Sequence, residues 1–108
     1  MRPLVYVAGP YSDDPVGNTR RAITAADQLL NAGIVPYVPH LSMFWDLLHP
    51  RPYADWLELD LEVVRRCDAV LRLSGNSPGA DREVAFAESE WVPVLYSVDE
   101  TIMWALAR

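Results

Sequence analysis

Short apolar runs alternate with helical patterns along the chain, and this alternation constrains the fold more than any other feature. The apolar runs cover residues 4–8, 34–38, 69–73 and 92–96. Apolar residues recur at helical spacing over residues 18–32, 54–67, 78–90 and 99–107. Strands separated by helices pair in parallel, with helices on both faces of the sheet. We therefore predict an α/β fold, a flavodoxin-like or Rossmann-like three-layer sandwich with a parallel sheet of four or five strands.

The length of the chain predicts one domain over residues 1–108, because 108 residues with 51% apolar side chains suffice for one core. No internal repeat or long polar linker interrupts the pattern. No apolar run approaches the roughly 20 residues needed to cross a bilayer, and the opening MRPLVYVAGPYS is typical of a first strand rather than a secretory signal. We expect a cytoplasmic protein that does not bind membranes.

Charge and residue usage exclude several classes of function. Nine basic and fifteen acidic residues give a net charge of −6, which disfavours binding to a nucleic acid polymer. The single cysteine, Cys67, excludes an internal disulfide and an all-cysteine metal site. All basic residues are arginine, so lysine-based covalent chemistry is excluded. His40 and His49 lack the spacing of metal ligands. A zinc site is therefore not expected.

Ligands of open parallel sheets bind beyond the carboxyl ends of the strands. That rule selects residues 9–12, 39–46, 74–79 and 97–100 before any chemistry is considered.

The segment SGNSPGADRE, residues 74–83, is the most informative of these. It leaves a strand, turns at glycines and enters a helix with Pro78 at the first helical position and Ser77 at the cap. Such a helix start can hold an anion. Glu83 follows between small alanines, which leave room for a ligand to approach its carboxylate. In the alternative interpretation, Asp81 and Glu83 only offset the helix dipole and face water.

Asp60 is the second candidate, because it lies on the apolar stripe of the helix over residues 54–67. A carboxylate there needs a partner or a proton. One alternative is a structural ion pair with Arg72, a strand residue that we expect to pair with a carboxylate. In the functional interpretation, Asp60 and Glu83 form a pair in different surroundings, as acid and nucleophile roles require. Asp68 and Cys67 are predicted to be structural.

Further candidates come from the first two strands. Tyr6 lies on the first strand, and Gly9 after it permits close approach of the backbone to a ligand. His40, Phe44 and Trp45 follow the second strand, where they could stack on a flat ring or pack as a lid.

Together these segments resemble a known family. The phrases are YVAGPYS, PHLSMFWD, WLELDLE, CDAVLRL and SPGADREVAFA. From Val5 to Val94 the chain resembles the nucleoside 2-deoxyribosyltransferase-like superfamily, and in particular its small bacterial members of unassigned substrate. The spacing from Asp60 to Glu83 is similar to that of the 2′-deoxynucleoside 5′-phosphate N-glycosidases.

The resemblance implies a retaining reaction at an N-glycosidic bond, with Glu83 as the nucleophile at C1′ of the sugar. It further implies that Asp60 assists sugar binding and protonation of the leaving base, and that Tyr6 orients Glu83. The resemblance also implies that the reaction needs no metal and no cofactor. The substrate would be a small nucleoside or nucleotide. The residues expected to bind it are Gly9, Pro10, Ser12, His40, Phe44, Trp45, Ser74, Ser77 and Gly79.

The chain departs from the nucleotide-cleaving relatives, which carry a serine and an arginine where this chain has Pro10 and Ser12. Recognition of a 5′-phosphate therefore stays open, as does the choice between hydrolase and transferase. Two other functions also stay open: a nucleotide-binding module without catalysis, and a phosphoribohydrolase of the lysine-decarboxylase-like family. The latter has a Gly-Gly-rich loop where this chain has SGNSPGAD. Four tryptophans in so small a chain predict a homodimer or higher homo-oligomer.

Overall fold

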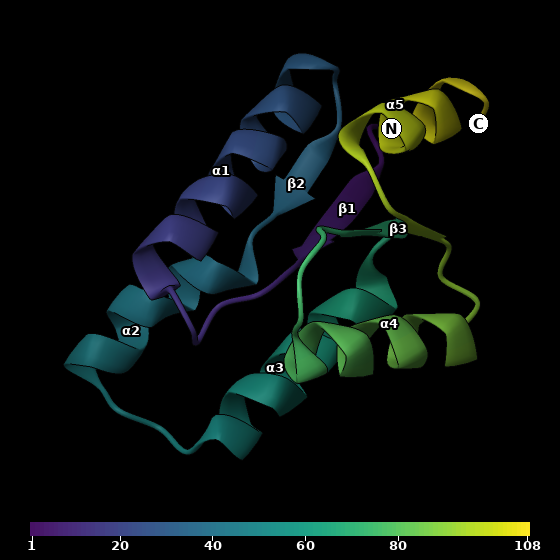
Figure 1. Cartoon of the computed structure of the whole chain (residues 1–108). Coiled ribbons are helices and arrows are strands. Elements are labelled where there is room, and N and C mark those ends of the chain that lie inside the picture. The colour runs from purple at the N-terminus through teal and green to yellow at the C-terminus, as the bar shows by residue number, and fades with distance from the viewer.

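Four parallel strands form the middle layer of the molecule (Figure 1). The computed structural model describes all 108 residues. The strands are β1 (Leu4–Ala8), β2 (Val35–Tyr37), β3 (Ala69–Arg72) and β4 (Val94–Leu95). Their order in the sheet is β2-β1-β3-β4, and Tyr6 on β1 faces Tyr37 on one side and Val70 on the other. This is the flavodoxin-like order, in which the direction of winding reverses beside β1.

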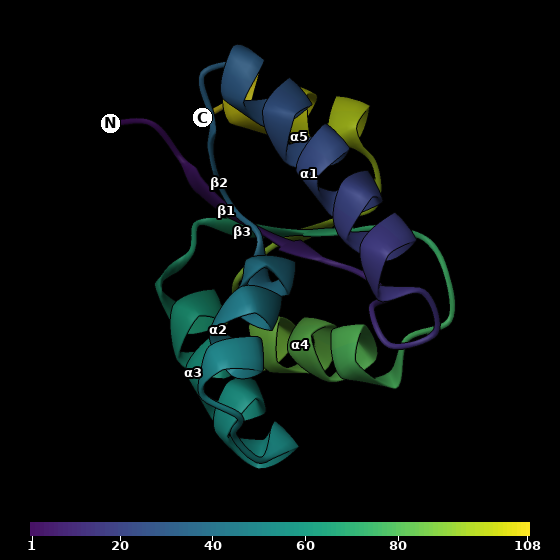
Figure 2. The ribbon, with the colours of Figure 1, turned by 90° about the vertical axis from the view of Figure 1, so that its left-hand side faces the viewer.

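Helices cover both faces of this sheet, which confirms the predicted three-layer α/β fold. The helices are α1 (Pro15–Asn31), α2 (Ser42–Leu48), α3 (Tyr53–Arg66), α4 (Pro78–Ser89) and α5 (Val98–Leu106), with a 3-10 turn at Pro39–Leu41. Figure 2 shows α1 and α5 on one side of the strands and α3 and α4 on the other. None of these helices combines the length and the apolar composition that crossing a bilayer requires.

Because helices cover both faces of the sheet, its strands are unbroken apolar runs in the sequence. Val5 and Val7 of β1 are fully buried against α1, where Leu29 is also fully buried. Tyr6 and Ala8 point to the opposite face and pack with residues of α3 and α4. Successive residues of a strand alternate between faces, so a strand covered on both sides needs apolar residues at every position.

Most differences from the predicted elements lie at their ends. Helix α1 begins at Pro15 rather than at residue 18, because the Asp14 carboxylate accepts a hydrogen bond from the amide of Gly17 at 3.2 Å and caps the helix. Strand β4 is shorter than predicted. The amide of Tyr96 donates to the Glu100 carboxylate at 3.2 Å instead of pairing in the sheet.

A larger difference concerns residues 42–48, for which the sequence predicted only an aromatic-rich stretch. They form helix α2.

Asp68 and Cys67 have structural positions, as predicted. The Asp68 carboxylate accepts a hydrogen bond from the amide of Leu4 at 2.7 Å and so joins the beginnings of β1 and β3. Cys67 is buried in the core between the sheet and α3.

Candidate active site

A cavity of about 610 Å³ opens beyond the carboxyl ends of β1 and β3. This is the point where the strand order reverses, and it is where open α/β sheets bind their ligands. Its walls come from four parts of the chain: the loop after β1, the turn and helix after β2, the inner side of α3, and the start of α4. The fold therefore brings together segments that are far apart in the sequence.

Glu83 enters this cavity from α4, although its residue is only 7% exposed. Alanines at positions 80 and 87 lie on the same side of the helix and are buried against the sheet. Their small side chains bring α4 close to β1, where the hydroxyl of Tyr6 donates a hydrogen bond to Oε2 of Glu83. The alternative in which Glu83 faces water is therefore wrong, while Asp81 is exposed as that alternative supposed.

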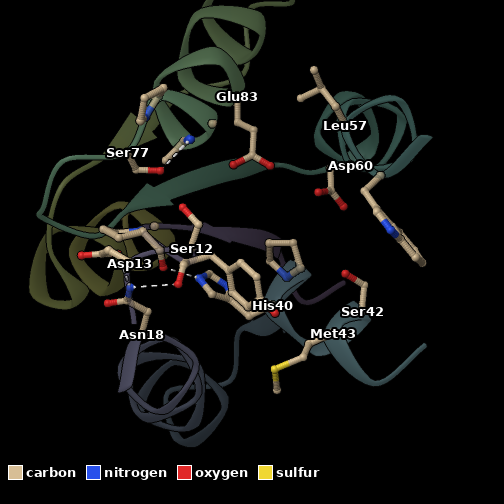
Figure 3. A pocket seen from close by; sticks show the side chains of 18 of the residues that line it. Ser12, Asp13, Asn18, His40, Ser42, Met43, Leu57, Asp60, Ser77 and Glu83 are labelled. Carbon is tan, nitrogen blue, oxygen red and sulfur yellow. Dashed lines mark hydrogen bonds between the residues drawn. The ribbon is translucent and has the colours of Figure 1, made fainter. Parts of the chain in front are cut away.

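Asp60 enters the same cavity from α3, and Figure 3 shows its carboxylate and that of Glu83 directed into one space. Its Oδ1 atom is buried and has no hydrogen-bond partner. The alternative ion pair between Asp60 and Arg72 is not formed. Arg72 instead pairs with Asp81 at 2.9 Å, because β3 ends beside the first turn of α4, which carries Asp81. Asp60 thus lies in the cavity without a cation beside it.

The pKa of each of the two carboxyl groups is raised above its ordinary value. Burial raises the pKa of Asp60 to about 7, and the nearby Tyr6 hydroxyl opposes the shift. Burial also raises the pKa of Glu83 to about 7, the Tyr6 hydrogen bond opposes this, the charge of Asp60 adds to it, and Arg72 counteracts it. Because the two carboxyl groups interact, each of the two deprotonation steps is a property of the pair and not of one residue alone. Near neutral pH the pair can hold one proton between two carboxyl groups.

Their different partners indicate which of the two holds that proton. The Tyr6 hydroxyl donates to Glu83 and therefore favours its ionised form. Asp60 has one oxygen without any donor, which favours its neutral form. The arrangement thus provides an ionised carboxylate and a carboxylic acid on two walls of one cavity.

His40 is also buried at the cavity wall, with 6% of its surface exposed. Its Nε2 lies 3.0 Å from the carbonyl oxygen of Pro10, and because a carbonyl only accepts, Nε2 carries the proton. Burial lowers the pKa of His40, so the ring is neutral, and its Nδ1 has no partner in the chain. His40 thereby holds the loop after β1 against the turn after β2.

The structure brings most of the predicted site residues together. The predicted binding residues that line the cavity with Asp60 and Glu83 are Gly9, Pro10, Ser12, His40, Ser77 and Gly79. Tyr6 lies beneath the cavity floor, where it contacts Glu83.

Three predicted binding residues, Phe44, Trp45 and Ser74, do not line the cavity. Helix α2 turns Phe44 outward, where it is 66% exposed, and packs Trp45 edge-on against Trp56 of α3. The oxygens of Ser74 accept hydrogen bonds from Arg21 of α1. The sequence analysis assigned no helix to residues 42–48, and without a helical period it could not tell which of these side chains face inward.

The same helix supplies cavity residues that the sequence analysis missed, namely Ser42, Met43 and Asp46. Oδ1 of Asp46 accepts hydrogen bonds from Trp56 Nε1 at 2.8 Å and from the amide of Arg51 at 3.0 Å. These contacts hold α2 against α3 at the cavity rim. Had residues 42–48 been read as a helix, the spacing of 42, 43 and 46 would have placed them on one face.

Comparison with solved structures shows where the fold has relatives. A 2-desoxiribosyltransferase from Leishmania mexicana superposes with a TM-score of 0.68 at 16% identity, over 87% of this chain and 63% of that one. A 2-deoxyribosyltransferase from the psychrotolerant bacterium Bacillus psychrosaccharolyticus gives a TM-score of 0.59 at 17% identity, over 84% of this chain and 69% of that one. This chain therefore spans less than two thirds of the first relative's length.

At such identities the likeness concerns the fold, which is that of these deoxyribosyltransferases. No protein of curated function matches the sequence. A family model described as "Domain of unknown function (DUF7768)" matches residues 3–97, and the chain therefore belongs to this family.

Proposed function

We propose that this protein cleaves or transfers at the N-glycosidic bond of a nucleoside-type substrate, through a covalent glycosyl-enzyme at Glu83. One observation carries the proposal: two carboxyl groups enter one cavity from different helices, Glu83 with a hydrogen bond from Tyr6 and Asp60 with one buried oxygen that has no hydrogen-bond donor. Retaining glycosidases use a pair of this kind. The resemblance to the nucleoside 2-deoxyribosyltransferase-like superfamily and the shared fold support the choice of an N-glycoside.

In the first step, Glu83 is the nucleophile. Its Oε2 is engaged by Tyr6, so Oε1 is the oxygen that attacks C1′ of the sugar. A C1′–O bond to Glu83 forms as the bond from C1′ to the base nitrogen breaks. Asp60 gives its proton to the departing base, so that the base leaves neutral.

In the second step, a water molecule or a second base attacks C1′ from the face that the first base left. Asp60, now ionised, accepts the proton of the attacking group, and the ester bond to Glu83 breaks. The sugar retains its configuration and both carboxyl groups return to their starting states. Water as acceptor makes the protein a hydrolase, and a base makes it a transferase.

Chromatographic detection of released base tests the proposal. The substrates are deoxynucleosides, ribonucleosides and their 5′-monophosphates, each with and without a second free base as acceptor. We expect base release by the parent and its loss in Glu83→Gln. Glu88→Gln is the matched control, because Glu88 is exposed on the same helix.

Mass spectrometry of acid-quenched protein adds a direct readout, since the covalent intermediate adds one sugar to the peptide that contains Glu83. Failure of every substrate, or a Glu83→Gln variant as active as the parent, would contradict the proposal. Tight binding of an unaltered ligand would instead indicate a nucleotide-binding module.

The expected homo-oligomer stays a prediction. The apolar side chains that α2 and the turn before it expose to solvent support it: Leu41, Phe44, Trp45, Leu47 and Leu48. Light scattering at micromolar concentration measures the mass, and a monomer would contradict the prediction.

A further inference from the structure

We propose that Asp46 selects the base of the substrate, and that the base it selects is guanine. This inference deepens the proposed function and rests on it. Asp46 lines the cavity from α2, and the proposed chemistry at Asp60 and Glu83 does not use it. The inference follows from the hydrogen bonds that fix the Asp46 carboxylate and from its place relative to Asp60.

The cavity continues from Asp60 along α3 toward the beginning of that helix. Tyr53, Trp56, Leu57 and Asp60 all line it, at a spacing that places them on one side of the helix. Trp56 lies one turn before Asp60, about 6 Å away along the helix axis at 1.5 Å per residue. This stretch of the cavity has α3, with Leu57, on one side and α2, with Met43, on the other (Figure 3).

One oxygen of Asp46 is engaged within the chain and the other is not. Its Oδ1 accepts hydrogen bonds from Trp56 Nε1 at 2.8 Å and from the amide of Arg51 at 3.0 Å. These two donors, the Arg51 amide most, lower the pKa of Asp46, so its carboxylate is ionised at neutral pH. Its Oδ2 accepts no hydrogen bond from the chain and keeps both of its acceptor sites. Asp46 therefore presents a negatively charged acceptor in a fixed position at the cavity wall.

The edge of guanine matches this acceptor, and the edges of the other common bases do not. Guanine carries two adjacent donors, N1–H and the N2 amino group, which can both point at one carboxylate oxygen. In adenine and cytosine the amino group lies beside a ring nitrogen with a lone pair. In thymine and uracil the N3–H lies between two carbonyl oxygens. These lone pairs repel an ionised carboxylate, so Asp46 discriminates against all four bases.

The distance from Asp60 also favours a purine. In the proposed reaction Asp60 protonates the leaving base, so the ring that is bonded to the sugar lies beside Asp60. The second ring of a purine extends away from it, and its N1 and N2 edge can reach the level of Trp56, to which Asp46 is bonded. A pyrimidine has no second ring to cover this distance.

The test compares kcat/KM for 2′-deoxyguanosine and 2′-deoxyinosine, whose base lacks only the N2 amino group. Both are also supplied as 5′-monophosphates, so that the comparison is made in whichever form is cleaved. We expect the parent to prefer the guanine compound by about ten- to hundredfold, which is the effect of one hydrogen bond to a charged group.

Asp46→Asn separates base selection from a purely structural role. Trp56 and Arg51 both donate at the Oδ1 position, so they keep the amide oxygen there and place the amide NH2 where Oδ2 was. A donor then meets the donors of guanine, and the preference over 2′-deoxyinosine should vanish. If Asp46 only held α2 against α3, the variant would keep both hydrogen bonds and the preference would not change. Glu58→Gln, at an exposed position of α3, is the matched control and should keep the preference of the parent.

An equal or lower kcat/KM for the guanine compound in the parent, or a preference that survives in Asp46→Asn, would overturn the inference and leave the proposed function intact. Cleavage confined to nucleosides or nucleotides of other bases would do the same.

If no nucleoside or nucleotide is cleaved, the proposed function fails, and calorimetric titration of the same compounds into the parent and Asp46→Asn then decides the inference by itself. Tighter binding of the guanine compound by the parent, lost in the variant, supports it. Equal affinities in the parent, an unchanged preference in the variant, or no binding at millimolar concentration overturns it.

Discussion

Replacing the buried carboxyl group of Glu83 by an amide should make the protein more stable, by an amount that grows as the pH rises from about 4.5 to about 7. The folded-state pKa of Glu83 is about 7, against an ordinary value of 4.5, because burial disfavours the charged form. As the pH rises above about 4.5, the unfolded chain loses this proton while the folded protein keeps it. The free energy of unfolding therefore falls until the pH passes about 7, and then levels off.

The magnitude follows from the pKa difference. Each unit is worth about 1.4 kcal/mol, so the rise from 4.5 to about 7 corresponds to a loss of about 3 kcal/mol above pH 8. Glu83→Gln has no proton to lose, and its amide oxygen can still accept the hydrogen bond from Tyr6. We expect the variant to exceed the parent by about 3 kcal/mol at pH 8.5 and to match it at pH 4.5.

Urea unfolding followed by circular dichroism at the two pH values measures this difference. With a slope of about 1.5 kcal/mol per molar urea, the midpoint of Glu83→Gln should lie about 2 M above that of the parent at pH 8.5. Glu88→Gln, on the exposed side of the same helix, should follow the parent at both pH values. No gain at pH 8.5, or an equal gain at pH 4.5, would refute the reasoning.

Further predictions concern Tyr6 and two glycines. Tyr6→Phe should move the acidic limb of the kcat/KM profile to higher pH, because the Tyr6 hydrogen bond lowers the pKa of Glu83; a profile from pH 5 to 9 with an unmoved limb would contradict this. Gly75→Ala should cost more than about 2 kcal/mol in urea unfolding, because φ is 120° and an added Cβ would lie 2.7 Å from Pro10. Gly33→Ala should cost only about 1 kcal/mol, because φ is 83° but the added Cβ meets open space; equal losses would contradict the packing argument.

The sequence was sufficient for the fold class because its signals are local. An apolar run of five residues that ends at a glycine and a proline, such as residues 4–8, favours a strand wherever it lies. Alternation of such runs with helices then specifies a parallel sheet and the edge at which ligands bind. The same periodicity placed Asp60 on an apolar helical stripe and Glu83 among alanines.

Which side chains contact one another was decided only by the tertiary structure. The sequence allowed Arg72 to pair with Asp60, but β3 ends beside the first turn of α4, and Arg72 pairs with Asp81 there. Aromatic side chains such as Phe44 and Trp45 suit a flat ligand by residue type, yet helix α2 directs both away from the cavity.

One physical reason explains why the elements could be predicted from the sequence and the side-chain contacts could not. Local periodicity depends on neighbouring residues, which the sequence contains directly. The contacts of a side chain depend on how elements distant in the sequence pack, and a shift of one residue changes the face on which it lies. The sequence by itself determined an α/β sandwich with acidic candidates at one edge. Only the packing of α3, α4 and β1 brought Asp60, Glu83 and Tyr6 to one site, where burial raises the pKa of both carboxyl groups to about 7.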